Sequence, residues 1–241
     1  MINTRQHTLV NYFASFCAVL LLSTTALAKP TPDTTISSSP EQSKTVIDIL
    51  SKLSNRHYNS PPLDDQLSSK FFDNYLNRLD GNKSFFLQAD IDEFQKYRYR
   101  LDDTVSKGDL EPGYVMFNRY QQRLIERLSN IVDHLPEMVA DMDFSLELER
   151  KDDPWPADTQ QADDLWRKII KSRVVSLRIA KKPEEEIVPL LKKRYQNQLN
   201  RVLQSNSEDA FQVYINSMTA LYDPHTNYLS PTTSENFNIN M

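Results

Sequence analysis

The hydrophobic positions of this chain recur mostly at spacings of three and four residues, which is the period of an α-helix. The pattern predicts a long helix from Pro112 to about Leu135, and Pro136 should kink or end it because a proline ring blocks the preceding turn. The same spacing predicts further helices over about residues 41–56, 64–80, 90–107, 158–180, 183–203 and 207–222. We therefore expect a mainly α chain with several helices.

Local signals mark several of the expected helix ends. Asn206 can cap the last helix, with Asp209 in its first turn, and Asp223-Pro224 should stop it because proline disfavours helical geometry in the residue before it. Gly108 suits a C-cap after the helix that ends near Lys107. Glycine occurs only three times, which argues against sheets with tight hairpins and supports the helical prediction.

Two segments leave alternatives open. Pro189 conflicts with a regular helix over residues 183–203, so either the first turn is irregular or the regular helix starts nearer Val188. The segment from residue 138 to 148 is ambiguous, because its apolar residues alternate as in a short strand. These residues are Phe144, Leu146 and Leu148.

Two apolar features between the helices are expected to serve packing. Residues 85–87 form a short apolar run that should lie under the helices. Trp155, in the loop of residues 151–156, is expected to anchor that loop by its large apolar ring rather than to bind a ligand.

The first 28 residues have the features of a secretory signal peptide. Arg5 gives a positive start, a short apolar run follows, and an A-x-A site predicts cleavage between Ala28 and Lys29. The apolar run is too short to span a bilayer, so a membrane anchor is the weaker alternative. We expect an exported protein.

Composition then divides the remaining chain. Residues 29–40 are rich in Pro, Ser and Thr and should form a flexible leader, and residues 41–221 should form the helical domain. Cys17, the only cysteine, lies inside the signal peptide, so the mature chain can form no disulfide and offers no thiolate.

The charge and the histidines exclude several classes of function. With a formal net charge of −5 and no basic patch, the chain is a poor candidate for binding nucleic acid or anionic lipid. Its mature histidines, His57, His134 and His225, have no ligand-spaced partners, and no glycine-rich phosphate loop is present. No metal, cofactor or nucleotide is expected.

The pair Asp223 and His225 is the strongest candidate for chemistry in the chain. A carboxylate that orients a histidine could serve acid–base catalysis, but no serine or cysteine nucleophile lies at a suitable spacing. The favoured interpretation is a turn in which Asp223 accepts backbone N–H groups and His225 bonds locally. We therefore expect no catalytic residue here.

The chain changes character after the last predicted helix. Residues 225–231 carry no helical signal and should form an ordered extended connector, and residues 237–241 alternate with the period of a strand. A strand needs a partner strand to pair with. We therefore expect residues 222–241 to be the connector and first strand of a missing domain, and the chain to be the front part of a longer protein.

The same stretch carries a resemblance. Residues 206–209, 223–231 and 235–238 resemble the join between the amino-terminal helical region and the PDZ-like domain of the tail-specific proteases, the carboxy-terminal processing peptidases of serine peptidase family S41. Weaker matches extend back to about residue 50. They are Tyr75-Leu76, Leu79-Asp80, Pro154-Trp155-Pro156, Leu165-Trp166 and Arg194-Tyr195.

The resemblance implies a function for the longer protein. Members of the family are serine endopeptidases whose serine and general-base lysine lie in a domain beyond the PDZ-like module, so this chain alone should be inactive. The resemblance implies a periplasmic location in a Gram-negative bacterium, with peripheral attachment to the inner membrane as a variant. It also implies substrates with apolar carboxyl termini and an adaptor lipoprotein as a partner.

Within this resemblance the chain is a helical scaffold and docking domain that packs against its own PDZ-like and protease domains. The matching residues of the joint to the next domain are Asp223, Pro224, His225, Thr226, Tyr228 and Pro231. The alternative is a stand-alone periplasmic helical binding protein, left from a split or interrupted protease gene.

Overall fold

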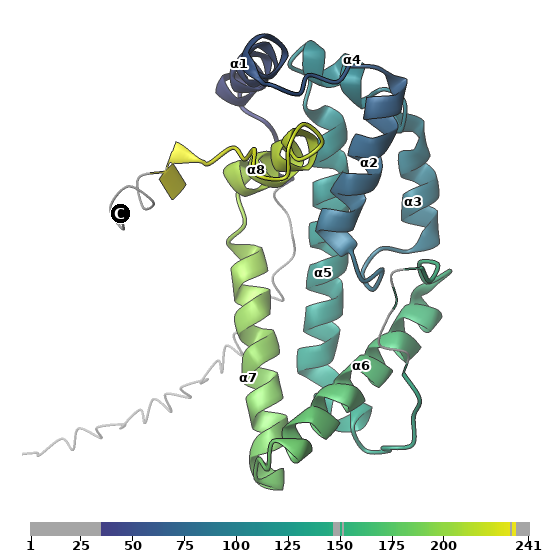
Figure 1. The fold of residues 1–241 in the computed structure, drawn as a ribbon. Helices are drawn as coiled ribbons and strands as arrows, with labels where there is room; N and C mark the ends of the chain where they lie inside the picture. Colours follow the sequence, from purple (N-terminus) through teal and green to yellow (C-terminus); the bar gives the residue numbers. More distant parts are fainter. Residues whose placement is uncertain (1–34, 147–149, 151, 232, 235–241) are drawn as a thin grey trace, which may run out of the picture. The chain divides into compact units, whose positions relative to one another are not determined.

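A computed structural model describes residues 35–146, 150, 152–231 and 233–234. These residues form α-helices, one short 3-10 helix and no strand, so the mainly α prediction is confirmed. The elements are α1 (Pro40–Arg56), α2 (Asp65–Asp80), α3 (Gln88–Phe94), η1 (Gln95–Tyr97), α4 (Leu101–Ser106), α5 (Glu111–Met138), α6 (Thr159–Ile179), α7 (Glu184–Leu203) and α8 (Ser207–Thr219) (Figure 1).

The long helix α5 packs against α2, α6, α7 and α8 (Figure 1). Helix α7 lies along one side of α5. Helices α2 and α8 pack against α5 and against each other. Helix α4 packs against both α1 and α2, and α6 contacts both α5 and α7.

The apolar side chains form two clusters that meet along α5. The first joins α1 to α4, the start of α5 and α8, and its largest fully buried side chains include Phe71, Tyr75 and Phe211. The second joins the rest of α5 to α6 and α7. Tyr120 of α5 packs against both clusters, so the helix links them. Burial of this kind stabilises the fold by roughly 1.5–3 kcal/mol for each large side chain.

Side chains at the helix starts confirm the caps that the sequence predicts. The Asn206 side chain accepts from the backbone N–H of Asp209, and the Asp209 carboxylate accepts from the N–H of Asn206, so both groups at the start of α8 are satisfied. Gly108 follows α4 with φ +75°, the left-handed conformation of a helix-ending glycine.

The single helix predicted over residues 90–107 is wrong. The chain instead forms α3, η1 and α4, with a break near Arg100. The Ser68 hydroxyl of α2 donates to the Arg98 carbonyl and accepts from the Leu101 N–H, both at 2.8 Å. Because Ser68 is buried and satisfies the two backbone groups that the break releases, a tertiary contact replaces the helical hydrogen bonds.

The prolines inside helices have different effects. Near Pro136 the helix is kinked as predicted, since His134 has non-helical angles, but α5 continues to Met138. Helix α7 passes through Pro189 from its start at Glu184, so the later start near Val188 does not occur.

Other predictions concern the segments between the helices. Residues 139–146 contain no strand, and residues 147–149 lie outside the described residues. Residues 35–39 belong to the predicted leader, and here Ile36 packs against the first cluster and exchanges two hydrogen bonds with the Asn118 side chain. The predicted signal peptide with Ala28 and Lys29, and the predicted strand over residues 237–241, lie outside the described residues.

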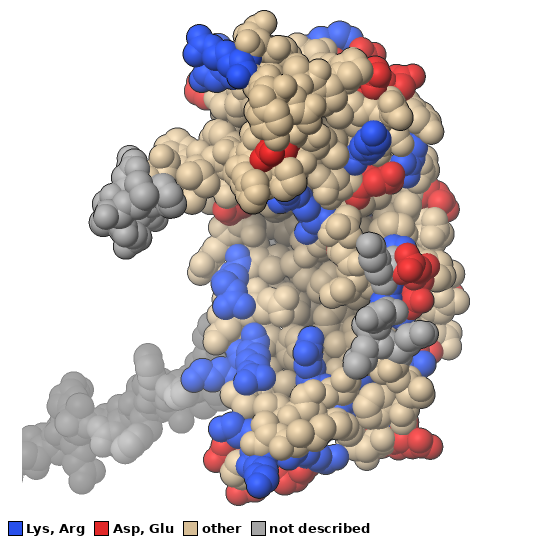
Figure 2. Space-filling model, viewed as in Figure 1, with Lys and Arg blue, Asp and Glu red and all other residues tan. Residues whose placement is uncertain are grey.

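The charges of the described chain are segregated. Residues 165–203, which cover most of α6 and all of α7, hold eleven Lys or Arg and three Glu, a formal excess of eight positive charges in a chain of net charge −5. Figure 2 shows Lys and Arg side chains gathered over α7 and the adjoining part of α6. The absence of a basic patch, predicted from the overall charge, therefore does not hold for these two helices.

Candidate functional site: a connector fixed to the helical body

The connector, residues 222–231, runs back along α8 from the end of that helix (Figure 1). Two buried polar side chains of α8 hold its backbone. Asn216 accepts from the Tyr228 N–H at 2.6 Å and donates to the Tyr228 carbonyl at 3.0 Å. Thr219 donates from its hydroxyl to the Thr226 carbonyl at 2.7 Å. The helix thus supplies the partners that a neighbouring strand would supply in a sheet.

The Tyr228 side chain also holds the connector, through contacts with residues nearer the start of α8. Its ring packs edge-on against Phe211 with centroids 5.1 Å apart, and its hydroxyl donates to Glu208 at 2.8 Å. Burial and the Glu208 carboxylate both raise the pKa of the Tyr228 phenol above its ordinary value, so the hydroxyl keeps its proton and remains a donor.

The loop between α1 and α2 contacts the connector from the other side. The His57 ring nitrogen Nε2 lies 3.0 Å from the Thr226 hydroxyl, and Asn59 donates to the Tyr222 carbonyl at 2.7 Å. The exposed Tyr58 hydroxyl donates to the Asp223 carboxylate. The connector is therefore held between α8 and a loop that lies more than 160 residues earlier in the sequence.

Asp223 organises a turn at the start of the connector. Its carboxylate accepts from the His225 N–H at 2.7 Å, and its carbonyl accepts from the Thr226 N–H at 3.0 Å. Within the described residues no hydrogen bond joins the carboxylate to the His225 ring, which is exposed. The geometry is that of a local turn rather than of an acid–base pair.

The electrostatics of the turn follow from these contacts. The hydrogen bond from Tyr58, followed by the one from the His225 N–H, holds the pKa of the Asp223 carboxyl below its ordinary value of 3.8. The same contact with Asp223 raises the pKa of the Tyr58 phenol. Near neutral pH the carboxylate is ionised and the phenol is protonated, which is the state that this hydrogen bond requires.

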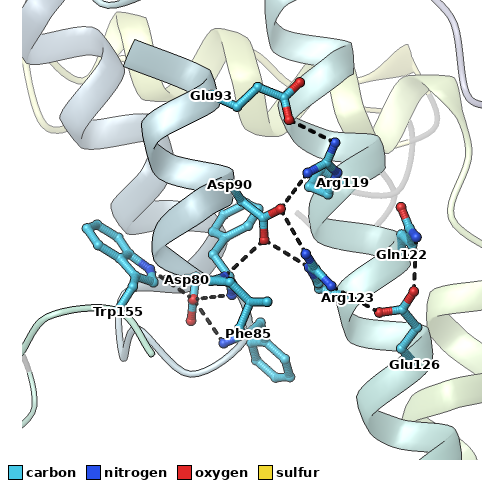
Figure 3. A network of polar contacts seen from close by, with 11 residues as sticks. Asp80, Phe85, Asp90, Glu93, Arg119, Gln122, Arg123, Glu126 and Trp155 are labelled. Carbon is cyan, nitrogen blue, oxygen red and sulfur yellow. Dashed lines mark hydrogen bonds and ion pairs between the residues drawn. The ribbon is translucent and has the colours of Figure 1, made fainter. Parts of the chain in front are cut away.

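A second polar group, centred on Asp80, has a structural explanation (Figure 3). The buried Asp80 carboxylate accepts from the backbone N–H groups of residues 84–86 at 2.9–3.0 Å and from the Trp155 indole at 3.2 Å. Trp155 also packs against the first apolar cluster, which agrees with its predicted role as an anchor. The carboxylate closes the turn after α2 and fixes the loop that contains Trp155.

Asp90 is the centre of a third polar group, also shown in Figure 3. This carboxylate is 1% exposed and lies against Arg119 and Arg123 of α5, and it caps α3 through the Leu87 N–H. Burial raises the pKa of Asp90, but the hydrogen bonds from Arg123 and Arg119 outweigh this effect and keep the pKa below its ordinary value. A fully paired carboxylate of this kind is a structural ion pair.

The described residues contain no group of three or more His, Cys, Asp or Glu side chains that could hold a metal ion. Nor does any helix in the described ranges have the length and apolar character needed to cross a membrane.

The structure brings together only some of the residues that the sequence singled out. Asp223, Thr226 and Tyr228 contact the helical body, whereas the side chains of Pro224 and Pro231 are exposed. The sequence does not indicate the residues with which the helical body holds the connector. They are His57, Tyr58, Asn59, Glu208, Asn216 and Thr219. The signal that could have found Asn216 and Thr219 is the occurrence of these two polar residues on a helix face that is otherwise apolar.

Comparison with known proteins identifies relatives. Residues 49–232 match the family model of the tail specific protease N-terminal domain. The chain is 35% identical over 191 residues to the tail-specific protease of Haemophilus influenzae, an alignment that covers 78% of this chain and 27% of the relative. The chain thus spans about a quarter of the length of this curated relative.

Proposed function

This chain belongs to the family of tail-specific protease N-terminal domains, and from that premise we propose that it is the non-catalytic helical scaffold of a tail-specific serine protease. In this proposal the connector positions the domain that follows. The observation that carries it is the double hydrogen bond between Asn216 and the Tyr228 backbone, which fixes a non-helical segment at the end of the helical body. A joint that sets the orientation of a second domain requires such a fixed exit.

The residues of the joint have two different roles in this proposal. Asp223, Thr226 and Tyr228 hold the connector on the body, and Pro224 restricts the backbone where the chain turns. His225 and Pro231 are exposed, and we assign them to contacts with the PDZ-like domain.

The remaining parts of the proposal concern the whole protein. The serine and lysine that cleave the substrate belong to a later domain, and this chain by itself has no peptidase activity. The protein works in the periplasm after removal of residues 1–28, and it degrades proteins from apolar carboxyl termini. The helical surface provides a docking site for an adaptor lipoprotein.

The intact mass of the native periplasmic product tests this proposal, with an antibody raised against residues 41–221 for its isolation. A species much larger than the chain, with endopeptidase activity, is the expected result. A species that matches residues 29–241 alone would refute it and would favour the stand-alone helical binding protein.

A further inference from the structure

A groove between α6 and α7 lies apart from the connector and has no role in the joint. Its volume is about 320 Å³, and its lining combines apolar and basic side chains. The lining residues are Trp166, Ile169, Arg173, Leu191, Arg194, Tyr195 and Gln198. Figure 2 shows the surface hollowed beside α7 in the region where the basic side chains gather.

The floor of the groove is apolar and rigid. Trp166, Leu191 and Tyr195 are at most 8% exposed and belong to the second apolar cluster. The Trp166 indole N–H donates to the Ser84 carbonyl at 2.7 Å, which fixes the orientation of the ring. A preformed apolar floor favours the binding of an aliphatic or aromatic side chain, because little conformational entropy is lost.

The rim of the groove carries positive charge that its surroundings do not neutralise. Arg173 and Arg194 are exposed, and neither forms an ion pair with a carboxylate of the described residues. Burial raises the pKa of the Tyr195 phenol, and the two guanidinium groups oppose that rise, so both charges act on the groove itself. Paired arginines above an apolar floor are complementary to a carboxylate placed next to an apolar side chain.

We propose that the groove between α6 and α7 binds an acidic peptide segment of a partner protein. One aliphatic or aromatic side chain of the segment lies on the floor, and its neighbouring carboxylates contact Arg173 and Arg194. This inference deepens the docking part of the proposed function and is independent of the joint, since no residue of the groove contacts the connector among the described residues.

The charge distribution favours a peptide over nucleic acid or an anionic membrane. Outside residues 165–203 the chain is strongly acidic, since its net charge is −5 despite the local excess of eight positive charges. A short acidic segment is attracted by the local positive charge of residues 165–203. A long polyanion or a flat anionic surface is also repelled by the negative charge of the rest of the chain.

The test is isothermal titration calorimetry of the whole chain with a synthetic peptide in which Glu residues flank Phe and Leu. We expect binding at an ionic strength of about 0.15 M. If the arginine charges and the apolar floor both contribute to the affinity, each of two altered peptides should bind at least about tenfold more weakly. One has Gln in place of Glu, and the other has Ala in place of Phe and Leu.

Matched double variants locate the binding. Arg173→Glu with Arg194→Glu should weaken binding by about tenfold or more, whereas Lys192→Glu with Lys193→Glu should change it less than about threefold. The second variant makes the same total charge change, but with two α7 residues that do not line the groove. All four side chains are exposed, so circular dichroism should show unchanged melting of both variants.

Several results would overturn the inference. These are no binding of the acidic peptide, equal loss of affinity in both double variants, or stronger binding of a single-stranded RNA or of phosphatidylglycerol vesicles. Self-association that the first variant abolishes would also overturn it, because the groove would then receive a second copy of the chain. The connector should stay resistant to protease in both variants. Failure of the peptide-binding proposal therefore does not refute the proposed role of the connector as a joint.

Discussion

Replacement of Asn216 by alanine should release the connector without disturbing the helical body. The side chain is 8% exposed and makes two hydrogen bonds, one from the Tyr228 N–H and one to its carbonyl. At about 1 kcal/mol net for each bond, their loss weakens the attachment of the connector by about 2 kcal/mol. This corresponds to about a 30-fold increase in the population with a detached connector.

Amide hydrogen exchange measures this population directly. The protection of the Tyr228 amide should fall about 30-fold in Asn216→Ala, and the protection of amides in α5 should not change. Alanine favours a helix more than asparagine does, so α8 itself should not fray.

Asn197→Ala provides the matched control. Asn197 is exposed on α7, and its side chain makes no hydrogen bond within the described residues. Unchanged protection at Tyr228 in Asn216→Ala would refute the reasoning, as would an equal loss of protection in α5, which would indicate general unfolding.

Three further predictions concern the body and the turn. Asp90→Asn leaves two partly exposed arginines without their buried partner, so the free energy of unfolding should fall by about 2 kcal/mol in urea titrations. Gly113→Ala places a Cβ 2.7 Å from the Tyr214 ring, and calorimetry should show a loss of about 1–2 kcal/mol; unchanged stability would contradict this packing. The folded-state pKa of the Asp223 carboxyl is lowered, so the hydrogen bond that it accepts from Tyr58 stabilises the joint above pH 3.8 and is lost as the pH falls through the lowered pKa. In carboxyl NMR titrations, Tyr58→Phe should move the pKa of Asp223 back toward 3.8.

The sequence was sufficient to predict the helices whose signals are local. Asp158 and Asn206 cap α6 and α8 through contacts within the first turn, and the spacing of apolar residues marks the buried face of α5. The break before α4 could not be predicted in this way, because it depends on Ser68. Nothing near Arg100 in the sequence indicates that a hydroxyl on another helix will satisfy the free backbone groups.

The site shows the same limit. The sequence predicts Asp223 as the centre of a turn because its partner, the His225 N–H, lies two residues away. The loop that contains Tyr58 lies 165 residues from Asp223, and its contribution appears only when the chain is folded. A formal net charge likewise averages over the chain and conceals the basic surface of α6 and α7.

The central claim is that the connector leaves the helical body in one fixed direction. Spin labels at Arg201→Cys on α7 and Leu229→Cys on the connector test it most directly, since both side chains are exposed and the only native cysteine, Cys17, can be replaced by serine. Double electron–electron resonance should give one narrow distance distribution, which Asn216→Ala broadens. A broad distribution in the chain with Asn216 intact would contradict the claim, because a connector that samples many directions cannot position the next domain.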